Sequence, residues 1–355
     1  MLGGAALLNE SPGADGVSDL CPDAADEGLC EIPVETQGEE QKIQEENKVR
    51  VAIVKTANRE DGIARAATLL GEMDFSGKNV YLKGSYNSPD PFPATTHLDA
   101  LGAMARMLRG KGAGGVTLVE RSGMGRTRDV LEKLNVLAAL NELDVSFCPL
   151  DELSPGEWRH FAPADSHWPK GFAFPRFLRD SCVVQLCNLK THRFGGIFSA
   201  SLKNSIGLIA KYAAVDSGAA EKGEKYSDRG WNYMKDLHAS PYHGQMIAEA
   251  NLAYTPELIV MDAVEIFVEG GPERGETAYP EIIAASRDRV ALDAVGLAIL
   301  LYAGARIGIN EHVFEQDQLM RAAELNLGVD SREKISIVSD DNAGRLMALR
   351  LESIL

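Results

Sequence analysis

Short apolar runs without polar alternation recur along the chain and are separated by segments with helical spacing. The clearest are residues 51–54 and 258–261, and the further predicted strands are 79–83, 116–119, 182–189, 282–286 and 335–338. Helical spacing predicts helices over 97–108, 127–143, 199–210 and 288–303; Thr95 or Thr96 would cap the first and Asp288 the last. Strands that are apolar on both sides are typical of a parallel sheet buried between layers of helices. The sequence therefore predicts an α/β fold, a mostly parallel sheet with helices on both faces. Right-handed crossovers would bring the carboxyl ends of the strands to one edge, where such sheets bind ligands.

The first 48 residues differ in composition from the rest. They hold 12 Asp or Glu, two Lys and no Arg, which leaves about −6 of the net charge of −16 for the remainder. An acidic segment with few aromatic residues cannot bury enough apolar surface to fold. We expect a disordered acidic leader over residues 1–48 and a single α/β domain over 49–355. Within the domain, residues 213–242 are rich in charges and predict a lid or insertion.

Composition excludes several classes of partner. A mildly acidic body argues against nucleic acid, because phosphates are held by Lys and Arg. No apolar run reaches the ~18 residues that a membrane-spanning helix needs, so we expect no membrane span. The five cysteines include no Cys-x-x-Cys pair, and the chain start lacks the basic region of a signal peptide. These features favour the cytoplasm and make an iron–sulfur cluster within this chain unexpected.

The run 182–189 ends abruptly in Lys190, Thr191 and His192. Lys is a point charge for phosphate or carboxylate, and His titrates near neutral pH or binds metal. A pair of glycines follows, and then a helical segment that carries Lys203 and Asn204. A glycine turn ahead of a helix presents free N–H groups to an anion. The alternative is a strand end whose polar residues simply meet water.

Other predicted strand ends carry polar residues that would converge with these. They supply Lys83, Asn87, Glu120, Ser122, Asp262, Gly270 and Gly271. Lysines and glycines would hold an anion, whereas carboxylates would bind a divalent cation or transfer protons. The alternatives are an Arg-rich helix start after Ser122, a plain turn at the glycines, and a cap or an ion pair to Lys203 for Asp262. His238 and His243 are interpreted as surface histidines near the end of the predicted lid.

Several segments, in order over about residues 50–305, carry a resemblance to a known family. They are Leu82-Lys-Gly-Ser-Tyr-Asn-Ser-Pro-Asp-Pro with Thr96-His97, Val119-Glu120, Asn188-Leu-Lys-Thr-His192 followed by Ser201-Leu-Lys-Asn204, Val260-Met-Asp262 with Glu269-Gly-Gly-Pro272, and Asp288-Arg-Val-Ala-Leu-Asp293. The chain resembles a bacterial and archaeal family known only as domain of unknown function 362. It departs from the family at Gly84 and Ala263, where the family tends to have Asn and Gly.

The resemblance implies little about chemistry. Members of the family are sometimes joined to a ferredoxin-like iron–sulfur module, and some carry export signals; neither feature is evident in this sequence. No P-loop or Gly-x-Gly-x-x-Gly motif assigns a cofactor either. The functional prediction therefore depends on the residues at the predicted strand ends.

We expect an enzyme that acts on a small phosphate- or carboxylate-bearing metabolite. The catalytic candidates are His192, Lys190, Asp262 and Glu120. The substrate-binding candidates are Lys83, Asn87, Ser122, Thr191, Lys203, Asn204, Gly270 and Gly271. A divalent metal would be held by Asp262, Glu120 and His97. Two alternatives are a redox protein associated with an iron–sulfur cluster or with a redox partner, and a non-catalytic binding or assembly protein.

Overall fold

The computed structural model describes residues 48–194, 197–212, 226–227, 230–306, 308 and 312–355. The predicted leader lies outside this part of the chain, apart from Lys48. Half of the predicted lid at 213–242, residues 213–225 and 228–229, also lies outside it, whereas helix α7 (Tyr233–Ala239) within the predicted lid is described. No helix among these residues is long and apolar enough to cross a membrane.

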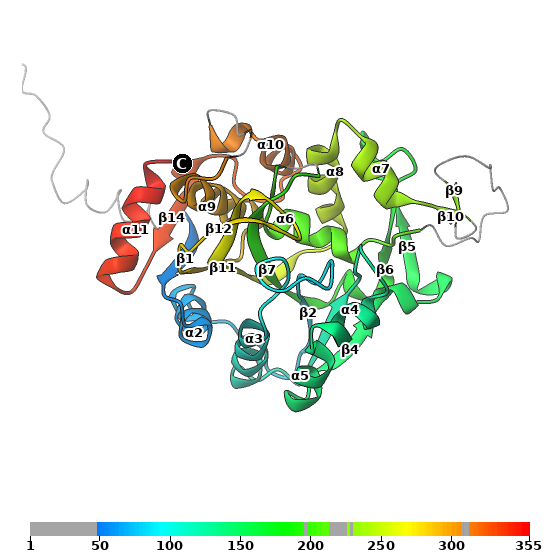
Figure 1. Ribbon diagram of the computed structural model, residues 1–355, viewed down its shortest axis with the longest axis horizontal. Helices are drawn as coiled ribbons and strands as arrows, with labels where there is room; N and C mark the ends of the chain where they lie inside the picture. The colour runs from blue at the N-terminus through cyan, green and yellow to red at the C-terminus, as the bar shows by residue number, and fades with distance from the viewer. Residues whose placement is uncertain (1–47, 195–196, 213–225, 228–229, 307, 309–311) are drawn as a thin grey trace, which may run out of the picture. The chain divides into compact units, whose positions relative to one another are not determined.

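The main sheet of the described residues has ten strands and is mostly parallel (Figure 1). Its order is β14 (Ile335–Val338), β1 (Val49–Lys55), β13 (Ile282–Ser286), β11 (Pro256–Gly270), β7 (Cys182–Thr191), β2 (Asn79–Lys83), β3 (Gly115–Glu120) and β4 (Ser146–Pro149), with β8 (Phe198–Ser199) on β7 and β12 (Gly275–Ala278) on β11. Along this order, only β13 runs antiparallel to its neighbours. The predicted fold class is confirmed.

Helices cover both faces of the sheet (Figure 1). One buried apolar cluster involves α2 (Arg59–Leu69), α3 (Leu98–Gly110), α4 (Thr127–Lys133) and α5 (Val136–Glu142), and the other involves α8 (His243–Ala250), α9 (Arg289–Tyr302), α10 (Asp317–Glu324) and α11 (Asn342–Glu352). Residues of β1 alternate between the two clusters, since Val51 belongs to one and Ala52 to the other. This period of two is that of a strand buried on both sides.

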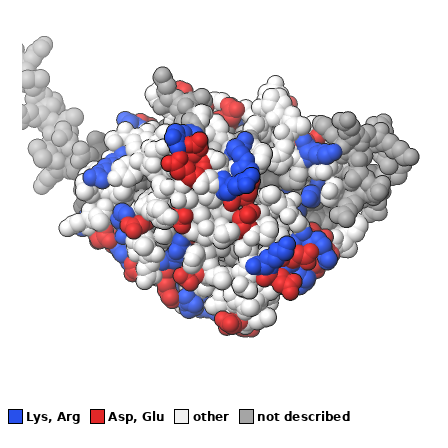
Figure 2. All heavy atoms as spheres, in the orientation of Figure 1, with Lys and Arg blue, Asp and Glu red and all other residues white. Residues whose placement is uncertain are grey.

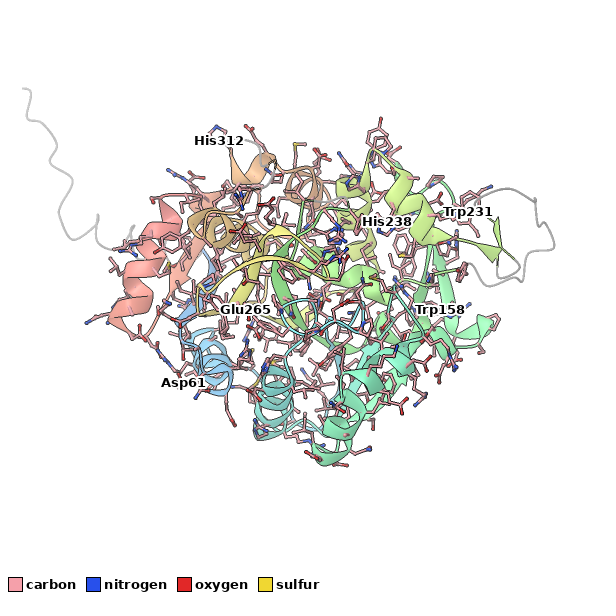
Figure 3. All side chains as sticks on the ribbon, viewed as in Figure 1. Asp61, Trp158, Trp231, His238, Glu265 and His312 are labelled. Atoms are coloured by element: carbon pink, nitrogen blue, oxygen red, sulfur yellow. The ribbon has the colours of Figure 1, made fainter. Side chains whose placement is uncertain are left out.

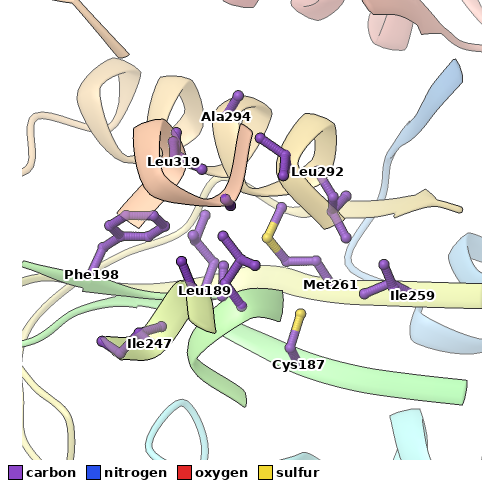
Figure 4. Packing of buried hydrophobic residues seen from close by; sticks show 14 of the residues in the cluster. Cys187, Leu189, Phe198, Ile247, Ile259, Met261, Leu292, Ala294 and Leu319 are labelled. Atoms are coloured by element: carbon purple, nitrogen blue, oxygen red, sulfur yellow. The ribbon is translucent and has the colours of Figure 1, made fainter. Parts of the chain in front are cut away.

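Helix α9 is apolar around most of its circumference because it is buried almost along its whole length. Figure 4 shows Leu292 of this helix on the side that faces Leu189 of β7 and Met261 of β11. Asp288 caps the helix as predicted, since its Oδ1 accepts hydrogen bonds from the backbone N–H of the second and third residues of the helix.

The order of the strands reverses between β2 and β7. From β2 the chain passes through α3 to β3 and through α4 and α5 to β4, at one edge of the sheet. It then returns to β7 on the other side of β2 and continues to β11 past α6 (Ser201–Asn204) and α8, which belong to the opposite face. In open α/β sheets, ligands bind beyond the carboxyl ends of the strands at such a point of reversal.

Three predicted elements differ from the structure. The strand predicted at 258–261 continues to Gly270, so Asp262 lies inside β11 rather than after a strand. The helix predicted at 127–143 breaks into α4 and α5 at Asn135, which has a φ of 58°. The helix predicted at 199–210 is the single turn α6, followed by the 3₁₀ segment Ser205–Leu208. These departures depend on tertiary contacts that a local pattern does not contain.

The packing of α9 gives a prediction for stability. Replacing Leu292 by Ala removes a fully buried side chain between this helix and the sheet. We expect the free energy of unfolding to fall by about 2–5 kcal/mol in urea denaturation. Leu346→Ala on α11, where the side chain is 52% exposed, is the control and should change it by less than about 0.5 kcal/mol. Equal losses in the two variants would contradict the assignment of the core.

Candidate functional site

A cavity of about 310 Å³ opens beyond the carboxyl ends of β2, β3 and β7. It lies at the point of reversal between β2 and β7, since Lys83 ends β2 and Lys190 is the last residue but one of β7. More than half of the predicted site residues line it, namely Lys83, Asn87, Glu120, Lys190, His192, Lys203 and Asn204.

A buried ion pair lies at the base of the cavity. The Nζ of Lys83 is 2.8 and 3.0 Å from the two carboxylate oxygens of Glu120, and both residues are only 1% exposed. Glu120 also accepts hydrogen bonds from the backbone N–H groups of Tyr86 and Arg121. Burial lowers the pKa of Lys83 and raises that of Glu120, and the attraction between the two opposes both shifts. Such additional hydrogen bonds are what a buried ion pair requires.

Two further lysines line the same cavity. The Nζ of Lys190 donates to the backbone carbonyls of Pro93 (3.2 Å) and Ala94. Burial, with a contribution from the charge of Lys83, lowers the pKa of Lys190 to about 7. Burial likewise lowers the pKa of Lys203 to about 7. Both lysines therefore titrate near neutral pH.

The cavity holds an excess of cationic groups. Among the described residues that line it, Glu120 is the one carboxylate, and Lys83 already neutralises it. On the face shown in Figure 2, by contrast, Lys and Arg side chains are mixed with Asp and Glu. The positive charge of the cavity is therefore not part of a broad positive patch on that face.

Two histidines also line the cavity. The Nδ1 of His192 accepts a hydrogen bond from the backbone N–H of Phe194 (3.2 Å), so the neutral ring carries its proton on Nε2. The Nδ1 of His238 lies 2.6 Å from the carbonyl oxygen of Met234 and donates to it, which leaves Nε2 as an acceptor. Burial of His192, and partial burial of the otherwise exposed His238 at the cavity, lower the pKa of each ring, and the charge of Lys203 adds to both shifts.

His238 was interpreted from the sequence as a surface residue. Its side chain is exposed, but it lies on α7 at the cavity (Figure 3). No sequence spacing connects it to His192, because α7 reaches the cavity through tertiary packing.

The amide of Asn204 is a second feature that suits a bound ligand, independent of the lysine charges. It is 8% exposed, and its Oδ1 accepts a hydrogen bond from Lys83 Nζ (3.2 Å). Its Nδ2 is buried and has no hydrogen-bond partner among the described residues. A buried donor without an acceptor costs about 1–3 kcal/mol. An acceptor atom of a ligand in the cavity would remove this cost.

Two residues hold the segment that carries Lys203 and Asn204. Asp293 of α9 accepts hydrogen bonds from the backbone N–H groups of Ser201 (2.7 Å) and Leu202 (3.0 Å). At the other end, Arg121 donates to the carbonyls of Ile206 (2.7 Å) and Ile209 (2.6 Å). The predicted set lacked Arg121, although its place directly after Glu120 at a strand end was an available signal.

The predicted metal ligands do not come together. Asp262 does not line the cavity; its Oδ2 lies 2.7 Å from Arg59 Nε, and its Oδ1 accepts from the N–H of Val264. His97 caps α3 through Nδ1, in the place where Thr95 or Thr96 was expected. Across the described part of the chain, no three His, Cys, Asp or Glu side chains are grouped to hold a metal ion. Glu120 and Asp262 instead form ion pairs with Lys83 and Arg59, respectively.

The other predicted substrate-binding residues support the backbone. The Oγ of Ser122 donates to the carbonyl of Tyr86 (2.5 Å), and the Oγ1 of Thr191 donates to the carbonyl of Phe267 (3.2 Å). Gly270 and Gly271 have φ values of 83° and 68° in the turn after β11. A Cβ on Gly271 would lie 1.9 Å from the carbonyl oxygen of Thr191, so glycine allows this turn to pack against the end of β7.

The described cysteines are free. Cys187 is buried, whereas Cys148 and Cys182 are only partly buried. Burial raises the pKa of all three thiols, which makes them less reactive. Cys21 and Cys30 lie outside the described residues.

Comparison with known proteins gives the family. The family described as domain of unknown function (DUF362) matches residues 80–298, a range that contains every cavity residue named above. The chain belongs to this family, as its sequence segments predicted. A crystal structure of a protein from Thermotoga maritima, from the Northeast Structural Genomics Consortium, is similar with 16% identity and a TM-score of 0.41. The similarity covers 69% of this chain and 57% of that one. No curated protein matches the chain.

The turn after β11 gives a second prediction. Gly271→Ala and Gly304→Ala both place a side chain at a positive φ, which costs about 1–2 kcal/mol. At Gly304 no other atom lies within 4 Å of the added Cβ, whereas at Gly271 the carbonyl of Thr191 blocks it. We expect Gly271→Ala to lower the free energy of unfolding more than Gly304→Ala in denaturant titrations. The same loss for both would show that the turn does not pack as described.

Proposed function

We propose that this protein is an enzyme that acts on a small organic anion in the cavity between β2 and β7. The observation that carries the proposal is the excess of cationic groups: Lys83, Lys190 and Arg121 line a cavity whose one described carboxylate, Glu120, is already paired with Lys83. A carboxylate or phosphate group would balance this charge. Its oxygens would also accept the hydrogen bond that Asn204 Nδ2 does not make within the described chain.

Binding of an anion would be coupled to protons. Lys190 and Lys203 have pKa values of about 7, so each is only partly charged at neutral pH. A bound negative charge favours the protonated amines and raises both pKa values. The protein would therefore take up protons when it binds the anion near or above pH 7.

The groups around the bound anion suit proton transfer. In the neutral state, His192 offers an Nε2–H donor and His238 an Nε2 acceptor. Lys203, whose charge acts on both rings, can give or accept a proton near neutral pH. General acid–base catalysis is most efficient when the pKa of the group lies near the working pH. The reaction class that these features support is proton transfer to or from a bound organic acid.

Acetate is a suitable probe because its charge stays constant at neutral and alkaline pH. We expect its affinity, measured by titration calorimetry, to fall as the pH rises above about 7, because Lys190 and Lys203 then lose their protons. Titrations in two buffers of different ionisation enthalpy should show net proton uptake. An affinity independent of pH, with no proton uptake, would contradict the role of the two lysines.

The contribution of Lys203 can be tested separately. A charge-assisted hydrogen bond is worth about 1.5–3 kcal/mol, so Lys203→Met should weaken acetate binding by about 10- to 100-fold. Lys334→Met removes a surface lysine that pairs with Asp330 and serves as the control with unchanged affinity. Equal affinities of the two variants would place the anion outside this cavity.

A further inference from the structure

The cavity has two chemically different parts. The charged and amide groups Lys83, Glu120, Lys190 and Asn204 are 8% exposed or less and form its floor. The large apolar residues Met124 and Phe194 also line it, but they are 53% and 51% exposed. The cavity therefore combines a buried charged part, here called the floor, with an apolar part, here called the rim, of which Met124 and Phe194 are exposed.

The rim is built from several separate elements. Met124 lies in the loop between β3 and α4, and Phe194 lies after β7. Met234 and Leu237 of α7 and Pro272 after β11 line the same cavity. Single exposed apolar residues are common on protein surfaces, but apolar residues that converge on one cavity from separate elements mark a binding surface.

We propose that the ligand is an organic anion with an apolar, aromatic body, bound with its anionic group on the floor and its body against the rim; this inference rests on the proposed function. Inorganic phosphate or a short hydrophilic acid would occupy the floor and leave the rim exposed to water. Met124 favours an aromatic body, because thioether sulfur makes favourable contacts with aromatic rings, whereas the Sδ of Met234 already accepts a hydrogen bond from Arg121 (3.4 Å). A cavity of about 310 Å³ is at the lower end of the range for small-molecule sites, which suits a body of about one ring.

Three probes separate the two parts of the cavity. Acetate carries only the anionic group, benzoate adds a ring, and benzyl alcohol has the ring without the charge. Burial of a ring should make benzoate bind at least about tenfold more tightly than acetate in titration calorimetry. Benzyl alcohol should bind more weakly than benzoate, because it cannot balance the cationic floor.

The outcomes distinguish this inference from the proposed function. Equal affinities for acetate and benzoate would overturn the aromatic body while leaving an anion site in place. Benzyl alcohol that binds as tightly as benzoate would overturn the anion site. If neither anion binds, both proposals fail.

Variants at the rim test the position of the ring. Phe194→Ala and Met124→Ala alter exposed side chains and should leave folding intact. Each should reduce the preference for benzoate over acetate by about threefold or more, with acetate affinity unchanged. Tyr279→Ala removes an aromatic side chain that is 65% exposed and does not line the cavity, and should leave the preference unchanged. A preference that survives both rim substitutions would overturn the assignment.

Discussion

The buried ion pair between Lys83 and Glu120 fixes the charge of the cavity. An isolated carboxylate at that depth would be too costly, and Lys83 together with two backbone N–H groups compensates it. Because Glu120 is already paired with Lys83, its carboxylate contributes little to stabilising the charged forms of Lys190 and Lys203. Burial lowers the pKa of both lysines to about 7 and leaves a cavity suited to an anion.

The surrounding fold keeps this unfavourable arrangement in place. The reversal of strand order sets β2 beside β7, which continues past the end of β2, and Asp293 and Arg121 fix the short segment that carries Lys203 and Asn204. Buried lysines and an amide donor without a partner all reduce stability. Proteins accept such costs at functional sites, and here the large apolar clusters on both faces of the sheet offset them.

Much of the fold was predictable because short apolar runs mark buried strands. The bounds of β2, β13 and β14 agree with the sequence prediction, and Asp288 caps α9 as expected. Asp262 shows where local pattern fails. A charged residue after four apolar residues resembles a strand end, but Arg59, far away in the sequence, compensates the charge and lets β11 continue.

The cavity was predictable to a similar extent. Lys190 and Lys203 could be identified because a polar strand end and a following helical turn are local features. The rim and His238 could not, since α7 and the loops reach the cavity only through tertiary packing. Arg121 directly follows Glu120 at the end of a predicted strand, so it could have been included among the predicted site residues, but it was not.

The central claim is that the cavity binds an organic anion with its charged group inward. A crystal structure with 4-bromobenzoate tests it most directly, because the anomalous signal of bromine fixes the orientation of the ligand. The account predicts the carboxylate beside Asn204 Nδ2 and Lys203, with the bromine near Met124 and Phe194. A carboxylate at the rim with bromine on the floor, or an empty cavity at saturating ligand, would contradict it.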